Sequence, residues 1–171
     1  ITITSGIANV ATGTKGLKDA ETMAKTTAKE LNLKTNDVLV ASTGLIGAYL
    51  PIEKIKKAIK GTKQQLKKQS TPAAKAILST DTKIKQSVKK VGNITIGAIA
   101  KGAGMIHPNM ATMLSFIFTD AKIPSKKLQK MLKVAVNKSF NMISVDLDTS
   151  TSDMVILMAN GEKGSVNENK F

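Results

Sequence analysis

The chain has no cysteine, no tryptophan and no arginine, and it has a single histidine. The absence of cysteine excludes disulfides, thiolate metal sites and a cysteine nucleophile. One imidazole, that of His107, is too few for a histidine-based zinc site. The sequence therefore leaves few routes to covalent catalysis, and it predicts no metal site of these kinds.

Long apolar runs are also missing. No run approaches the ~20 residues that a membrane-spanning helix needs. The first residues, 1–4, alternate as ITIT, which is typical of a strand and not of a signal peptide. We therefore expect no membrane partner and a cytoplasmic location.

Positive charge predominates, because 26 lysines stand against 12 aspartates and glutamates and give a formal net charge of +14. Nucleic-acid recognition relies on arginine for bidentate phosphate and guanine contacts and on aromatic rings for base stacking. Arginine is absent, and aromatic residues make up 3% of the chain. The lysines thus predict a solvated surface and no nucleic-acid partner. A non-enzymatic basic module that binds polyanions remains as an alternative.

With 171 residues, 42% of them hydrophobic, the chain can bury one sizeable core. Apolar spacing predicts helices over residues 18–31, 52–61, 64–69 and 126–140. It predicts strands over residues 1–3, 37–41, 87–91, 93–100, 112–118, 143–146 and 154–159, with a hairpin turn at Gly92-Asn93. Helices and strands mix without strict alternation. We therefore expect an α/β or α+β fold, a layered sandwich of sheets covered by helices.

Residues 101–114 read KGAGMIHPNMATML and offer a nucleophile that needs neither cysteine nor histidine. Cleavage of the backbone before Thr112 would free an α-amino group, with an ordinary pKa near ~8, on a residue that carries a hydroxyl. That amine can act as general base for its own side-chain oxygen. Gly102 and Gly104 free the preceding backbone for unusual angles. The plainer interpretation is a threonine at the start of a buried strand.

Two further stretches carry polar groups. Residues 42–44, Ser-Thr-Gly, follow a short apolar strand, and a turn at a strand end is a fair place for an oxyanion hole. Residues 145–153 read VDLDTSTSD and have oxygen ligands at alternate positions, as a calcium loop does. This stretch lacks the glycine and the distal glutamate of an EF-hand, so we expect no metal there.

These stretches closely resemble motifs of the ornithine acetyltransferase (glutamate N-acetyltransferase) family of arginine biosynthesis. The resemblance runs from residue 5 to residue 161 and is most specific over residues 42–47, 101–114 and 146–153. In the last of these, leucine and serine replace the glycine and asparagine of the family pattern. Residues 5–10 depart from the pattern, and we assign them no role.

The resemblance implies self-cleavage between Ala111 and Thr112, with Thr112 as the nucleophile of the mature enzyme. It gives the oxyanion hole to Thr43 and Gly44. Acetyl would pass from N-acetylornithine to Thr112 and then to glutamate, and acetyl-CoA is a second donor in some members. No metal and no organic cofactor is implied. The family fold is a layered α/β sandwich.

The resemblance also implies substrate contacts by Lys101 and by a hydroxyl of the 79–82 turn, for which we name Thr80. His107 varies in the family, so we expect it to be a bystander.

Members of the family are about twice as long and assemble from α and β pieces. We expect residues 1–111 to belong to the α piece and residues 112–171 to start the β piece, in one structural domain. The chain would be an incomplete middle part of such an enzyme, and its pieces would associate into a hetero-oligomer. A related self-cleaving aminopeptidase, which uses the same nucleophile on a peptide bond, is the enzymatic alternative.

Overall fold

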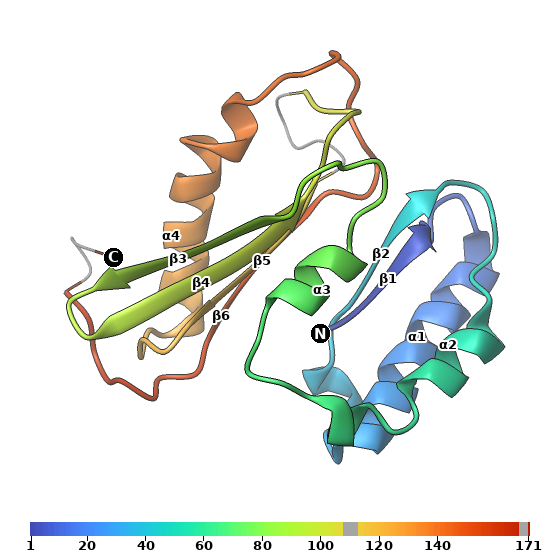
Figure 1. Cartoon of the computed structure of the whole chain (residues 1–171), viewed down its shortest axis with the longest axis horizontal. Helices are drawn as coiled ribbons and strands as arrows, with labels where there is room; N and C mark the ends of the chain where they lie inside the picture. The colour runs from blue at the N-terminus through green and yellow to red at the C-terminus, as the bar shows by residue number, and fades with distance from the viewer. Residues whose placement is uncertain (108–112, 168–170) are drawn as a thin grey trace. The chain divides into compact units, whose positions relative to one another are not determined.

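The computed structural model describes residues 1–107, 113–167 and 171 (Figure 1). Within this part the chain divides into two compact units, Ile1–Gln69 and Ser70–Phe171. Ala111 and Thr112, the expected cleavage site, lie outside the described residues.

The N-terminal unit combines a parallel strand pair with helices. Its elements are β1 (Thr2–Ile7), α1 (Gly13–Leu31), the 3-10 helix η1 (Thr35–Asp37), β2 (Val40–Leu45), α2 (Ile52–Ile59) and the 3-10 helix η2 (Thr62–Gln65). In the strand pair Thr2 lies opposite Val40, and Gly6 lies opposite Gly44. Helix α1 packs against the strands and runs beside α2 (Figure 1).

Helix α1 forms because its small and apolar side chains recur at helical spacing. Met23, Ala24, Thr27 and Ala28 are buried, and Ala24 and Ala28 form a core cluster with Val38. The helix begins earlier than the predicted residue 18 and ends at Leu31, as predicted. It ends there because Asn32 adopts a left-handed conformation with φ of 57°, which asparagine tolerates.

The C-terminal unit is built on a four-stranded sheet. Its elements are α3 (Thr71–Ala76), β3 (Lys85–Val91), β4 (Ile94–Lys101), β5 (Leu114–Thr119), α4 (Ser125–Asn137), the 3-10 helix η3 (Phe140–Met142) and β6 (Met154–Ala159). The strands follow the order β3-β4-β5-β6, in which β3, β4 and β5 are antiparallel and β6 runs parallel to β5. Helix α4 lies along one side of the sheet (Figure 1).

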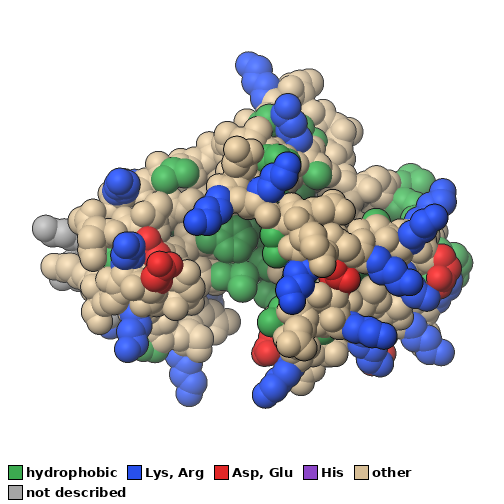
Figure 2. All heavy atoms as spheres, turned by 60° about the horizontal axis from the view of Figure 1, so that its bottom comes forward, with side chains coloured by type: hydrophobic (Ala, Val, Ile, Leu, Met, Phe, Trp, Pro, Cys, Tyr) green, Lys and Arg blue, Asp and Glu red, His purple; other side chains and the backbone are tan. Residues whose placement is uncertain are grey.

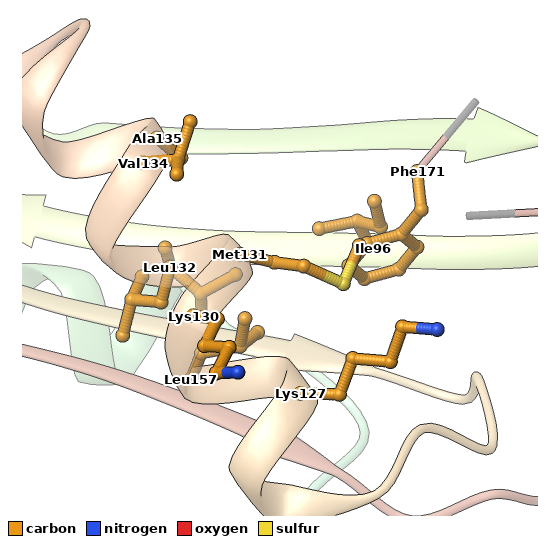
Figure 3. A pocket seen from close by; sticks show the side chains of 10 residues that line it. Ile96, Lys127, Lys130, Met131, Leu132, Val134, Ala135, Leu157 and Phe171 are labelled. Atoms are coloured by element: carbon orange, nitrogen blue, oxygen red, sulfur yellow. The ribbon is translucent and has the colours of Figure 1, made fainter. Parts of the chain in front are cut away.

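Apolar side chains of β4, β5, β6 and α4 form the interior of this unit. Ile94 and Phe116 are fully buried. A cavity of about 560 Å³ lies between α4 and the sheet, and Ile96, Met131 and Phe171 are among its lining residues (Figure 3). Apart from Lys127 and Lys130 its lining residues are apolar, so this cavity offers few polar groups for acid–base chemistry.

Strand β3 is the exposed edge of the sheet. It pairs only with β4 among the described residues, and most of its side chains face solvent, including Lys89, Lys90 and Val88. Lysines are spread across the face of the molecule displayed in Figure 2 and do not gather in one patch there. No helix in the described part of the chain is long and apolar enough to cross a membrane.

The structure confirms the mixed α/β fold, the helix that begins at Ile52, the hairpin at Gly92-Asn93 and the strand over Met154–Ala159. The predicted strand over 143–146 is wrong, because the Asp146 side chain bonds to another loop and Leu147 has a φ of 64°. The helix predicted over 64–69 is wrong too. Only η2, at Thr62–Gln65, forms there.

Candidate active site

Thr43 and Gly44 lie inside strand β2 and not in a turn after it, which corrects the prediction of a strand over 37–41 followed by a turn. The strand continues because Gly44 lies opposite Gly6 of β1. Gly44 has a φ of +128°, and a Cβ atom there would lie 2.3 Å from the carbonyl carbon of Gly6. Only glycine fits this position, and Thr43 beside it is buried.

The N-terminal turn, to which the sequence assigned no role, holds the segment that carries Thr43. The backbone N–H of Asn9 donates to Ser42 Oγ at 2.8 Å, and the N–H of Ala8 donates to the carbonyl of Leu45 at 2.8 Å. Beyond the end of β2, the N–H of Gly47 donates to the carbonyl of Val10 at 3.1 Å. Residues 42–47 are therefore fixed mainly by backbone groups.

Lys101 is the last residue of β4 and is one of the most buried side chains of the chain, at 2% exposure. Its Nζ donates to Ser79 Oγ at 2.9 Å. Burial lowers the pKa of Lys101, and Lys85 lowers it further, while Asp81 and Asp153 act in the opposite direction. A lysine buried at a strand end with a lowered pKa is typical of a functional site.

The turn over residues 79–82 reaches Lys101 through its serine. Ser79 accepts the lysine hydrogen bond, whereas Thr80, the residue named from the sequence, is exposed and makes no hydrogen bond within the described residues. Within this turn, Ser79 supplies the hydroxyl that accepts a hydrogen bond from Lys101. The prediction that Thr80 contacts substrate stays a prediction.

Asp81 is a residue of this site that sequence reasoning missed. Its side chain is fully buried, and its Oδ1 accepts hydrogen bonds from Lys85 Nζ and, at 2.8 Å, from the N–H of Gly102. Burial raises the pKa of Asp81, but these bonds and the neighbouring lysines outweigh it, so the pKa lies below its ordinary value. The sequence offered one signal for Asp81, its place between two threonines shortly before β3.

Asp146 holds the loop that follows Lys101. Its carboxylate accepts the N–H of Met105 and, at 2.7 Å, the N–H of Ile106. The N–H of Val145 donates in return to the carbonyl of Ile106 at 2.7 Å. The backbone N–H of Ile106 and that of Met105 lower the pKa of Asp146, which is therefore a carboxylate at neutral pH.

Asp153 holds the chain on the other side of the expected cleavage site. Its Oδ1 accepts the N–H of Met113 at 2.7 Å, and the N–H of Met154 donates to the carbonyl of Met113 at 3.0 Å. The second oxygen, Oδ2, is buried and accepts no hydrogen bond within the described residues. Burial raises the pKa of Asp153, although the bond from Met113 and the charge of Lys101 act against it.

These segments line one cavity of about 450 Å³, whose walls include Lys85, Lys101, Gly102, Met113 and Val145. The C-terminal unit thus places Lys101 beside the residue that directly follows Thr112 in the sequence. A cavity of this size can hold a small molecule.

The predicted site residues are divided between the two units. Thr43 and Gly44 belong to the N-terminal unit, whereas Thr80 and Lys101 belong to the C-terminal unit. His107, the expected bystander, has its Nδ1 at 3.1 Å from Ser144 Oγ. Over residues 1–107 and 113–167, no three His, Asp or Glu side chains are grouped so that they could hold a metal ion.

This chain is similar to several bacterial proteins named arginine biosynthesis bifunctional protein ArgJ. It is 54% identical over 169 residues to the arginine biosynthesis bifunctional protein ArgJ of Thermotoga neapolitana, covering 96% of this chain and 43% of that protein. It is 49% identical over 172 residues to ArgJ 2 of Clostridium acetobutylicum, covering 100% of this chain and 44% of that protein. The chain therefore spans less than half the length of these curated relatives.

The fold has a solved counterpart. The crystal structure of the arginine biosynthesis bifunctional protein ArgJ from Bacillus halodurans is similar with a TM-score of 0.54 and 40% identity, over 66% of this chain and 60% of that one. The family model described as the ArgJ family matches residues 1–171. The resemblance drawn from the motifs is confirmed, and the chain belongs to the ArgJ family.

Proposed function

We propose that the protein containing this chain transfers acetyl from N-acetylornithine to glutamate through an acetyl ester on Thr112. The observation that carries the proposal is the convergence of both flanks of the cleavage motif on one cavity. Lys101, Gly102 and Met113 line that cavity together. The name of the relatives, arginine biosynthesis bifunctional protein, supports the same chemistry.

The nucleophile forms by self-cleavage. Thr112 Oγ attacks the carbonyl carbon of Ala111, the peptide C–N bond breaks, and the nitrogen takes the hydroxyl proton to become a free α-amine. Water then hydrolyses the resulting ester, which leaves the Ala111 carboxylate and restores the Thr112 hydroxyl. Residues 1–111 form one piece and residues 112–171 begin the other.

Acetyl transfer then uses this amine and hydroxyl. The amine takes the proton of Oγ as Oγ attacks the acetyl carbon of N-acetylornithine. Thr43 and Gly44 stabilise the oxyanion, and ornithine leaves with the proton. In the second step the amine of glutamate attacks the ester carbonyl and the C–O bond to Thr112 Oγ breaks. The proton of the attacking amine passes through the Thr112 amine to Oγ, which restores the hydroxyl and releases N-acetylglutamate. Acetyl-CoA, the second donor that the resemblance implies for some members, would enter the first step in place of N-acetylornithine. The scheme requires no metal and no organic cofactor.

Lys101 has two roles in the proposal. As a nearby cation it lowers the pKa of the Thr112 amine, which keeps more of that amine in the free-base form. It also contacts substrate, together with Thr80. The bond from Lys101 Nζ to Ser79 Oγ supports a fixed position for the lysine.

The pieces remain associated after cleavage in this proposal, and the pairs of pieces assemble into a larger hetero-oligomer in the cytoplasm. Strand β4 lies before the cut and β5 after it. The two pair antiparallel, from Ile96 opposite Thr119 to Lys101 opposite Leu114. These backbone hydrogen bonds do not depend on the covalent connection, which supports continued association.

Cleavage is tested by intact mass of the full-length protein. Thr112→Ala should remain a single uncut chain. Thr112→Ser, which keeps a hydroxyl, should still be cut before residue 112. If the alanine variant is cut at the same bond, self-cleavage by Thr112 is wrong.

The transfer is tested by mixing the cleaved enzyme with N-acetylornithine alone. One acetyl mass should appear on the piece that begins at Thr112, and initial rates against both substrates should give the parallel lines of a ping-pong mechanism. Hydrolysis of a peptide amide without acetyl transfer would favour the aminopeptidase instead. Intersecting lines without an acetyl adduct would mean direct transfer.

A further inference from the structure

The two ends of the turn at residues 146–153 bond to the two flanks of residues 108–112. Asp146 accepts the N–H groups of Met105 and Ile106, before this stretch. Asp153 accepts the N–H of Met113, directly after it. Asp148, between them in the turn, is exposed, and its carboxylate accepts no hydrogen bond within the described residues.

Each aspartate bond is accompanied by a backbone bond in the same place. The N–H of Val145 donates to the carbonyl of Ile106 at 2.7 Å, and the N–H of Met154 donates to the carbonyl of Met113 at 3.0 Å. Each flank therefore donates a hydrogen bond to an aspartate and accepts one from the backbone N–H of a residue next to that aspartate. This arrangement fixes the position and the orientation of each flank.

The upstream flank also has an unusual backbone. Met105 has a φ of 55°, a left-handed conformation that is unfavourable for a residue with a side chain. The carboxylate of Asp146 bonds to the N–H of this same residue. The hydrogen bond to the acidic turn thus stabilises a backbone conformation that the loop does not favour by itself.

We propose that Asp146 and Asp153 are positioning residues that hold the two flanks of the Ala111–Thr112 bond. Asp146 serves the cleavage step, and Asp153 serves cleavage and acetyl transfer. This inference rests on the proposed function, since it assigns roles in the same two reactions.

The division of roles follows from where the cut falls. Asp146 lies after the cut, and its partners Met105 and Ile106 lie before it. Once the chain is cut, their bond joins two pieces and no longer constrains Thr112 through the chain. Asp153 and Met113 both lie after the cut, so their bond continues to fix the residue next to the nucleophile.

The substitutions follow from the hydrogen-bond chemistry. Asp146 uses both oxygens as acceptors, so Asp146→Asn places an N–H₂ donor against a backbone N–H. Asp153 uses one oxygen for Met113. Asp153→Ala removes this acceptor, and Asp153→Asn keeps it. Asp148→Asn is the matched control for loss of one negative charge from the turn.

The first readout is the rate of cleavage in the full-length protein, followed by intact mass. Misplacing a reacting group by about 1 Å can cost ~100-fold in rate. Asp146→Asn and Asp153→Ala should each slow cleavage by at least about tenfold. Asp148→Asn should cleave within about twofold of wild type, and Asp153→Asn should recover most of the rate lost in Asp153→Ala.

The second readout is steady-state acetyl transfer by protein that has finished cleavage. Matured Asp146→Asn should keep kcat within about threefold of wild type, whereas matured Asp153→Ala should lose at least about tenfold in kcat at unchanged KM. Thermal melting tests whether each variant is folded. If Asp153→Ala does not fold, the cleavage rate and kcat of Asp146→Asn decide the question. Asparagine has nearly the shape of aspartate, and the side chain of Asp146 is exposed.

The positioning roles are overturned if Asp146→Asn and Asp153→Ala cleave as fast as Asp148→Asn while the wild type cleaves and transfers acetyl. They are equally overturned if both matured variants lose the same activity, since the roles would not divide at the cut. A wild-type protein that is not cut before Thr112, or that transfers no acetyl, contradicts the proposed function itself.

Discussion

The two segments proposed to serve the reaction are held in different ways. Residues 42–45 lie in strand β2, and residues 42–47 are fixed mainly by backbone bonds to β1 and to the turn after β1. The flanks of the cleavage motif are fixed by the side chains of Asp81, Asp146 and Asp153. The first segment thus depends on backbone shape, whereas the second depends on three ionisable groups and on the pH.

The largest expected effect concerns the backbone-held segment and is on activity. Thr43→Ala should lower kcat of the cleaved enzyme by about 100–1000-fold, as the loss of one oxyanion donor does. Cleaved, folded enzyme is assayed with N-acetylornithine and glutamate. An unchanged kcat would remove Thr43 from the oxyanion hole.

Gly44→Ala tests the shape of the same segment. A Cβ atom would lie 2.3 Å from the carbonyl carbon of Gly6, at a φ of +128°. Strain and overpacking together should lower the free energy of unfolding by on the order of 3 kcal/mol or more. Gly47→Ala is the control, because its φ is also positive but no atom lies within 4 Å of the added Cβ. It should cost about 1–2 kcal/mol. Equal losses in denaturant unfolding would show that the close contact with β1 is unimportant.

Asp81→Asn tests the segment held by side chains. It removes the charge that accepts bonds from Lys85 and Gly102. Hydrogen bonds to a charged group contribute about 1.5–3 kcal/mol, so we expect a loss of unfolding free energy of that size. Because the pKa of Asp81 is lowered, its contribution is present above the ordinary carboxyl pKa near ~3.9 and is lost as the pH falls through the lowered value. A variant as stable as wild type at neutral pH would contradict this.

The smallest effect is a pH trend at Asp153. Burial raises the pKa of this group in the folded state. Its contribution to stability is therefore full below the ordinary value near ~3.9 and is lost as the pH rises through the raised one. Asparagine at position 153 carries no charge. The Tm of Asp153→Asn should therefore rise relative to the Tm of wild type as the pH rises from about 3 to about 7. Asp148→Asn corrects for the loss of one negative charge. A Tm difference that does not change with pH would exclude a raised pKa.

Much of the fold follows from local patterns in the sequence. The spacing of Ala24 and Ala28 predicts α1, and the apolar run over Met154–Ala159 predicts β6. The strand β2 was placed too early. Its continuation through Gly44 depends on the matching glycine of β1, far away in the sequence, and no local pattern contains that information.

The candidate site was predictable only in part. Family motifs point to Thr43 and Lys101, but composition and spacing do not single out one lysine among 26. The roles of Asp81, Asp146 and Asp153 depend on hydrogen bonds between residues 21 to 41 positions apart. The composition of the acidic turn predicts no metal site, but it also gives no sign that Asp146 and Asp153 accept backbone N–H groups.

The lysines of β3 have a consequence for how copies of the protein behave together. An edge strand presents unpaired N–H and C=O groups that can join the sheet of another molecule. Charged side chains on such a strand make this pairing unfavourable, because two copies would bring like charges together. Lys89 and Lys90 are exposed on β3, which also carries an exposed Val88. The two lysines thereby oppose edge-to-edge aggregation, and replacing both with threonine would remove their repulsion.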